Sequence, residues 1–183
     1  TSITFEPGTD VLEFTGGHAA QLRFEIDGAD LLVRLGTATP VRLLGVQVAD
    51  LLGSSLQFAD NSQFRVGTVL DDFLFGFDGH DYLDGMAGSD TIDGGSGNDL
   101  LSAGPGDDLL LGGSGQDTLH GSGGRDTLDG GEGDDTYLVD DAHTRVVDSG
   151  GFDTMMVEAS YVKLPSSIEQ VTYAAGAQAL PYW

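Results

Sequence analysis

The chain has 183 residues, no cysteine and a formal net charge of −23 at pH 7. The absence of cysteine excludes disulfides and thiolate metal sites, and the negative charge makes nucleic acid and anionic membrane surfaces poor partners. No apolar run approaches the length of about 18 residues that a membrane-spanning helix requires. A chain this acidic needs counter-charge, which multivalent cations supply.

Residues 1–66 predict an N-terminal β cap domain made of short strands. Residues 21–26 alternate apolar and polar side chains, residues 27–30 carry turn signals, and residues 31–35 are the expected hairpin partner. Further strands are expected at residues 41–48, 56–58 and 63–66. A single helical turn is expected at residues 49–52.

Residues 67–138 form a block that repeats every nine residues. Seven gapless copies of a Gly-Gly-x-Gly-x-Asp-x-apolar-x pattern run from residue 76 to residue 138. Their aspartates are Asp81, Asp90, Asp99, Asp108, Asp117, Asp126 and Asp135, with Asp72 one period upstream. A bulky apolar residue follows each of the seven two places later, at Leu83, Ile92, Leu101, Leu110, Leu119, Leu128 and Tyr137. A fixed short period indicates a stacked repeat.

The repeat requires metal on physical grounds. Two repeats make one coil, so aspartates two repeats apart stack about 4.8 Å from one another and repel. One buried apolar side chain per repeat does not offset the cost of ordering a segment this rich in glycine. Carboxylate and carbonyl oxygens favour Ca²⁺ over Mg²⁺, whose geometry is stricter. We therefore predict that calcium binding supplies folding free energy.

The nonapeptides, of which residues 94–101 and 112–119 are the best copies, resemble the haemolysin-type calcium-binding repeats of RTX proteins. The resemblance implies an all-β, right-handed parallel β-roll in which one ion lies between turns that are two repeats apart. In that family the earlier turn offers its second and fourth carbonyls and its Asp, and the later turn offers its first and third carbonyls and its Asp.

Carried over to this sequence, the resemblance implies five calcium sites. The first edge has Phe77, Gly79 and Asp81 with Gly94, Ser96 and Asp99; then Gly95, Gly97 and Asp99 with Gly112, Ser114 and Asp117; then Gly113, Gly115 and Asp117 with Gly130, Glu132 and Asp135. The second edge has Met86, Gly88 and Asp90 with Ala103, Pro105 and Asp108; then Gly104, Gly106 and Asp108 with Gly121, Gly123 and Asp126.

The ends of the block add up to two more ions, so the resemblance implies about five to seven in all, each with the oxygen ligands that calcium takes. Asp153 lies two repeat lengths beyond Asp135 and follows two glycines, which favours a further site there. Thr144 stands where the next aspartate of the second edge would be, which weakens that edge. Asp72 lacks the turn glycines, which argues against a site shared with Asp90.

Residues 139–183 predict a C-terminal strand cap and a linker. Strands are expected at residues 145–147, 155–157 and 168–173, and residues 174–183 are interpreted as the linker. Residues 136–141, 151–154 and 167–172 resemble the cap that commonly follows RTX repeats, and residues 10–66 resemble a domain often found before them. Because the chain starts without Met or a charged and apolar leader, we expect it to be a piece of a longer protein.

The sequence predicts a structural role and no catalysis within this chain. Neither a His-Glu-x-x-His pair nor a Gly-x-Ser-x-Gly elbow occurs, and the four histidines fall at unrelated positions. By resemblance, the protein is secreted unfolded by a bacterial type I secretion system and folds in extracellular calcium. The alternatives are an accessory, polysaccharide-binding or scaffold domain of a secreted hydrolase, or a calcium-stiffened segment of an adhesin.

Overall fold

The computed structural model is all-β and describes residues 61–158 and 164–173, together with the backbone of six strands that precede them. Those six are β1 (Ser2–Ile3), β2 (Glu13–Phe14), β3 (Leu22–Asp27), β4 (Asp30–Leu35), β5 (Val41–Leu43) and β6 (Ser55–Phe58). The antiparallel pairing of β3 with β4 confirms the expected hairpin. The helical turn expected at residues 49–52 and the linker at residues 174–183 lie outside the described residues.

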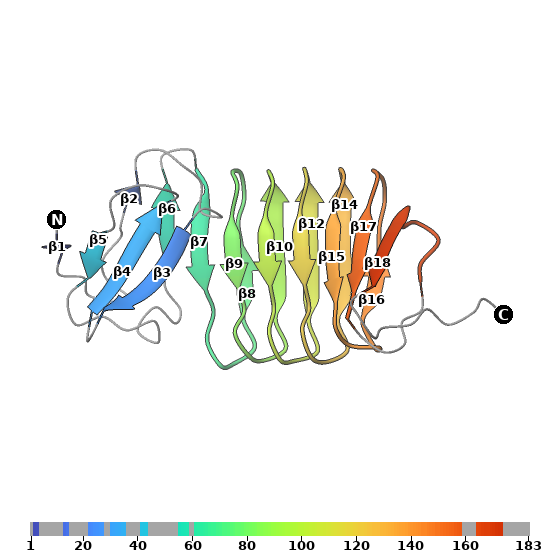
Figure 1. The fold of residues 1–183 in the computed structure, drawn as a ribbon, viewed down its shortest axis with the longest axis horizontal. Helices are drawn as coiled ribbons and strands as arrows, with labels where there is room; N and C mark the ends of the chain where they lie inside the picture. Colours follow the sequence, from blue (N-terminus) through green and yellow to red (C-terminus); the bar gives the residue numbers. More distant parts are fainter. Residues whose placement is uncertain are drawn as a thin grey trace.

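From β7 onward the chain winds into a parallel β-solenoid of stacked coils, which Figure 1 shows side on. One face contains β8 (Phe73–Phe75), β10 (Thr91–Ser96), β12 (Leu109–Ser114), β14 (Thr127–Glu132) and β16 (Arg145–Val147). The other contains β7 (Gln63–Val66), β9 (Tyr82–Asp84), β11 (Leu100–Ser102), β13 (Thr118–His120), β15 (Thr136–Val139), β17 (Thr154–Val157) and β18 (Gln170–Tyr173).

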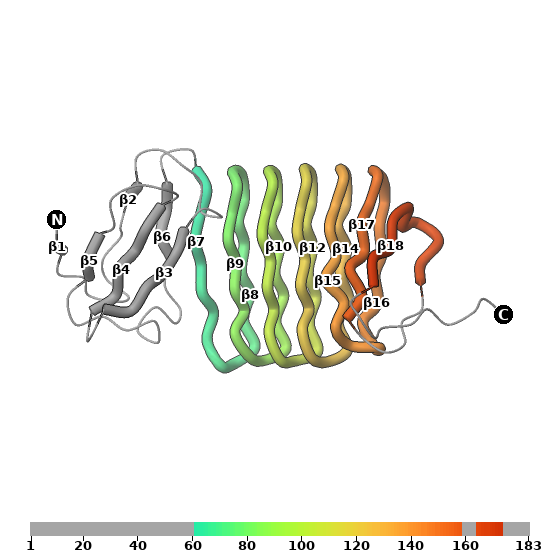
Figure 2. The backbone as a smooth tube through the Cα atoms, viewed as in Figure 1, coloured from blue at the N-terminus to red at the C-terminus, as the bar shows by residue number. Residues whose placement is uncertain are grey.

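The register of both sheets confirms a coil that is two nonapeptides long. Leu101 pairs with Leu119 on one face, and Leu110 pairs with Leu128 on the other. The same offset relates the parallel pairs of the solenoid from β7 to β17. The backbone tube in Figure 2 follows these coils as they lie side by side.

The core is the row of eighth positions from each repeat. The strands alternate inward and outward side chains, because successive residues of a strand point to opposite faces. All seven apolar residues singled out by the period, from Leu83 to Tyr137, have 0% exposure, and Met155 extends the row at 0%. The apolar eighth residues therefore fill a narrow interior between the two sheets, and Val139 and Val157 add a second buried side chain to β15 and β17.

The ladders continue past both ends of the repeat block. At one end β7 pairs with β9, and the rings of Phe64 and Tyr82 stack with centroids 5.0 Å apart. At the other end β16 and β17 add further strands, and β18 joins β17 with a shorter offset than the one that relates the coils. The division into residues 1–66, 67–138 and 139–183 stays a prediction.

Candidate metal centre

The sixth-position aspartates lie where each turn enters a strand, and all of them are buried. Their exposed fractions are at most 4%, from Asp81 at 0% to Asp108 at 4%, and Asp153 is also at 0%. Asp81, Asp99, Asp117, Asp135 and Asp153 precede the strands of one face, and Asp90, Asp108 and Asp126 precede those of the other. The structure thus gathers the predicted aspartates into two lines, one along each edge of the roll.

One oxygen of each carboxylate is used by the backbone. The amide of Asp99 donates to Oδ1 of Asp117 at 2.8 Å, and the amide of Asp117 donates to Oδ1 of Asp135 at 2.8 Å. The same bond, at 2.8 to 3.2 Å, runs from the amides of Asp72, Asp81, Asp90, Asp108 and Asp135 to the aspartate of the next coil. This oxygen fixes the orientation of each carboxylate toward the preceding coil.

The second oxygen of most of these carboxylates is buried without a hydrogen-bond partner. The set consists of Oδ2 of Asp90, Asp99, Asp108, Asp117, Asp135 and Asp153. A buried carboxylate oxygen without a donor or counter-charge is strongly destabilising, and native proteins rarely contain one. A repeated row of such oxygens fits a divalent cation as their partner, since Ca²⁺ binds oxygen ligands.

Burial raises the pKa of these carboxyl groups. It brings the pKa of Asp117 to about 7 and those of Asp99, Asp108 and Asp135 to about 6, against the action of the backbone amides that lower them. For Asp108 and Asp135 the neighbouring carboxylates raise the pKa further. Without a cation, the ionised forms are therefore disfavoured in the folded roll.

This shift predicts opposite pH dependences with and without calcium. Carboxyl groups whose folded-state pKa is raised stabilise the metal-free fold below their unfolded pKa, and that stability is lost as pH rises through about 6 to 7. In chelator, we expect β-structure to increase as the pH falls from about 7.5 to about 5. When calcium is present, protons compete with the ion for the carboxylates. The calcium concentration at which half of the chains are folded therefore rises as the pH falls over the same range. Circular dichroism at several pH values measures both, and parallel trends would contradict this account.

The turns adopt the backbone angles that the repeat requires. Fourth-position glycines such as Gly97 (φ 137°) and second-position glycines such as Gly113 (φ 109°) have left-handed φ. Phe77 (φ 75°) and Met86 (φ 74°) keep this conformation although they carry side chains. At Gly97 a Cβ atom would overlap the carbonyl oxygen of Gly79 in the preceding coil.

The backbone ligand candidates line the same edges as the aspartates. The third-position carbonyls of Ser96, Pro105, Ser114, Gly123 and Glu132 accept amide bonds of 2.8 to 3.2 Å from the preceding coil. A Cβ on the first-position Gly112 would lie 2.5 Å from both Oδ2 of Asp117 and the carbonyl oxygen of Gly130. The first residue of this repeat therefore lies against the unpartnered Oδ2 of its own aspartate.

The line of aspartates along the second edge ends at a threonine on each side. On the second edge, Thr144 donates its hydroxyl to Oδ2 of Asp126 at 3.4 Å, so this oxygen has a partner. Upstream, Oδ2 of Asp72 accepts the amide and the hydroxyl of Thr68 at 2.6 and 2.8 Å. Both ends of this edge are therefore closed by threonine hydroxyls.

Sequence reasoning missed two residues that extend the first edge. The amide of Gln63 donates to Oδ1 of Asp81, and Glu169 Oε2 accepts the amide of Asp153 at 2.9 Å. Gln63 lies two repeat lengths before Asp81, so the period itself gave a signal for it. Glu169 follows Asp153 at a spacing that is no multiple of the repeat, so the period gave no signal for it.

A parallel β-solenoid with buried rows of carboxylates at both edges defines a calcium-binding β-roll, a class of structural module. Comparison with protein families gives the same result: the RTX calcium-binding nonapeptide repeat (4 copies) matches residues 66–101, 75–110 and 102–137. Residues 66–137 therefore form an RTX β-roll. A comparison with curated proteins found no match. In the described part of the chain, no helix has the length and apolar character to cross a membrane.

Proposed function

We propose that this chain is a module that folds when calcium binds between its coils, within a larger protein secreted from bacteria by a type I system. The observation that carries the proposal is the row of buried, unpartnered Oδ2 atoms. Calcium supplies the positive charge that allows these carboxylates to be buried while ionised. Low calcium leaves the acidic chain expanded for export, and higher calcium outside the cell folds it.

We further propose that the roll binds about five to seven ions, each held by several carboxylate and carbonyl oxygens, because one calcium ion takes six to eight oxygen ligands. Each ion lies between carboxylates of successive coils, such as Asp99 and Asp117, with carbonyls from the first to fourth turn positions. The first edge is favoured, because Oδ2 has no hydrogen-bond partner in Asp99, Asp117, Asp135 and Asp153, whereas Thr144 closes the second edge. In this proposal the described residues have no catalytic role.

A calcium titration followed by circular dichroism tests this function. We expect little β signal in chelator at neutral pH and a cooperative gain as calcium approaches the millimolar range typical of extracellular modules. Magnesium at the same concentration should give less signal, because it keeps its waters and demands stricter geometry. Identical spectra in chelator and in calcium would refute the proposal.

A further inference from the structure

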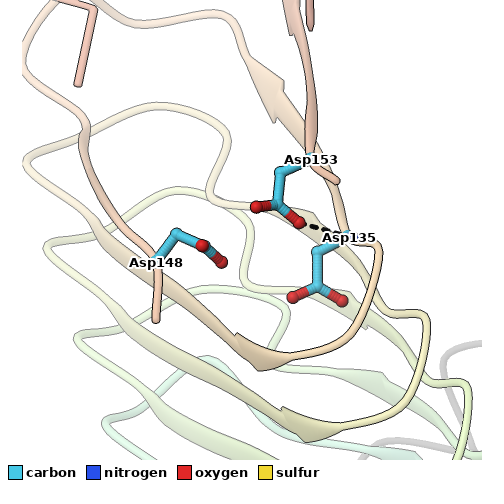
Figure 3. Close-up of side chains that lie close together, drawn as sticks. All are labelled: Asp135, Asp148 and Asp153. Carbon is cyan, nitrogen blue, oxygen red and sulfur yellow. Dashed lines mark hydrogen bonds between the residues drawn. The ribbon is translucent and has the colours of Figure 1, made fainter. Parts of the chain in front are cut away.

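Three carboxylates meet at the C-terminal end of the roll. Asp135 and Asp153 belong to the aspartate row, and Asp148 follows β16 on the opposite sheet. One oxygen from each of the three lies within 4.8 Å of the others. Figure 3 shows Asp148 facing the other two carboxylates across the end of the coil. At this end an aspartate side chain therefore approaches the row of carboxylates from across the coil.

Asp148 occupies a place that belongs to glycine in the preceding coils. It lies two repeat lengths after Gly130, just as Gly130 follows Gly112 and Gly112 follows Gly94. The pairing of Asp129 with Val147 keeps this register up to the preceding residue. A Cβ atom added at any of these glycines would lie nearest to Oδ2 of the aspartate five residues later. At Gly112 alone, the carbonyl oxygen of Gly130 would be equally near. A side chain at this position is therefore directed at the cation site.

A buried tyrosine holds the Asp148 carboxylate in place. Tyr137 replaces the aliphatic eighth residue of the other repeats and has 0% exposure. Its hydroxyl donates to Oδ1 of Asp148 at 2.9 Å and accepts the amide of Gly130 at 3.0 Å. Because the ring is packed in the core, the position of its hydroxyl is fixed. Tyr137 thus sets the orientation of Asp148, as a hydrogen-bonded neighbour commonly orients a metal ligand.

The two row aspartates present unpartnered oxygens to this place. Asp135 has 1% exposure and Asp153 has 0%, and Oδ2 of each has no hydrogen-bond donor. Oδ1 of Asp153 is engaged by the amide of Asp135 at 2.9 Å, so only its Oδ2 remains available. Two buried anionic oxygens next to a third carboxylate require a cation to remain ionised together.

We propose that Asp135, Asp148 and Asp153 bind one divalent cation through three carboxylates, and that Tyr137 is the positioning residue of Asp148. This inference rests on the proposed calcium function, and it adds the charged side chain of Asp148 to the ligands of the repeat site. Calcium affinity increases with the number of charged ligands. The site at this end of the roll therefore has the highest calcium affinity, and it prefers trivalent lanthanides more strongly than the other sites do.

Asp148→Asn tests the site by calorimetric calcium titration of the whole chain. Since outer partners of metal ligands change affinity by about 10- to 100-fold, we expect at least this loss at one ion and unchanged binding of the rest. Asp129→Asn is the matched control: it removes the same charge from the neighbouring strand, but Asp129 is not part of the cluster. Equal effects of the two substitutions, or no effect of Asp148→Asn, would overturn the proposal.

Terbium provides a second readout that does not depend on Asp148→Asn folding. Terbium bound at this site is excited through the ring of Tyr137, so the first equivalent should give strong emission. Tyr137→Phe keeps all three carboxylates, and we expect it to abolish most of that emission and to weaken one calcium site by about tenfold. Full emission in Tyr137→Phe would place the first ion elsewhere and reject the inference. A wild-type chain that binds no calcium would instead reject the proposed function.

Discussion

Replacing Asp117 with asparagine is expected to raise the calcium concentration needed for folding by at least about tenfold, the scale of effect seen for groups around metal ligands. Asp117 lies in the middle of the first edge and is shared by two proposed sites, one with Asp99 and one with Asp135. Asparagine retains an oxygen to accept the amide of Asp99, so the substitution removes the charge and little else. Both neighbouring ions lose a carboxylate at once.

The control for this prediction is Asp93→Asn, which removes one charge from a strand position that faces outward. Asp93 follows the buried Ile92 in β10 and is only partly buried. We expect the calcium concentration at half-folding to stay within about twofold of the wild type, because a charge on an outward-facing side chain is screened by water and salt. Calcium titrations of the two variants side by side measure the difference. A midpoint for Asp117→Asn that matches Asp93→Asn would contradict the role of the buried row.

Replacing Gly115 with alanine is expected to destabilise the calcium-loaded roll by about 3 kcal/mol or more, from backbone strain and steric overlap together. Gly115 has φ 127°, which side-chain-bearing residues rarely adopt, and its Cβ would overlap the carbonyl oxygen of Gly97. Relief requires the two coils to separate, which disturbs the space where the cation is proposed to bind. Urea unfolding at saturating calcium measures the change.

Gly123→Ala provides the matched control for the steric argument. Gly123 also lies in a turn of the repeat, but its φ is not left-handed and nothing lies within 4 Å of an added Cβ. We expect a change of less than about 1 kcal/mol, and a stabilising one if the smaller entropy of the unfolded chain dominates. Similar losses in both variants would show that the contact between coils at Gly115 is not the cause.

The repeat block could be predicted from the sequence because one period determines several levels of structure together. The nonapeptide spacing correctly gave the coil of two repeats, the buried row from Leu83 to Tyr137 and the two edges of aspartates. Phe77 and Met86 stand at the second turn position, where the best copies of the repeat have glycine, and their φ values of 75° and 74° show that they keep the turn conformation. In each case a local rule and the stacking agree, which makes the prediction secure.

The ends of the roll were harder to predict because their contacts lie outside the nonapeptide motif. Asp148 stands in register with glycines, and only the fold shows that its side chain meets Asp135 and Asp153. Glu169 reaches Asp153 after a connection that breaks the spacing of the coils. Thr144 was recognised as a missing ligand, but its hydroxyl bond to Asp126 depends on side-chain geometry that spacing does not encode.

Hydrogen exchange with and without calcium tests the central claim most directly, namely that cations between the coils hold the roll together. The amides of Leu100, Thr118 and Thr136 each donate to an aspartate carbonyl of the preceding coil, so they report on stacking at successive levels. At neutral pH we predict slow exchange of these amides in calcium and fast exchange, close to that of an unfolded chain, in chelator. Equally slow exchange in both conditions would contradict the account.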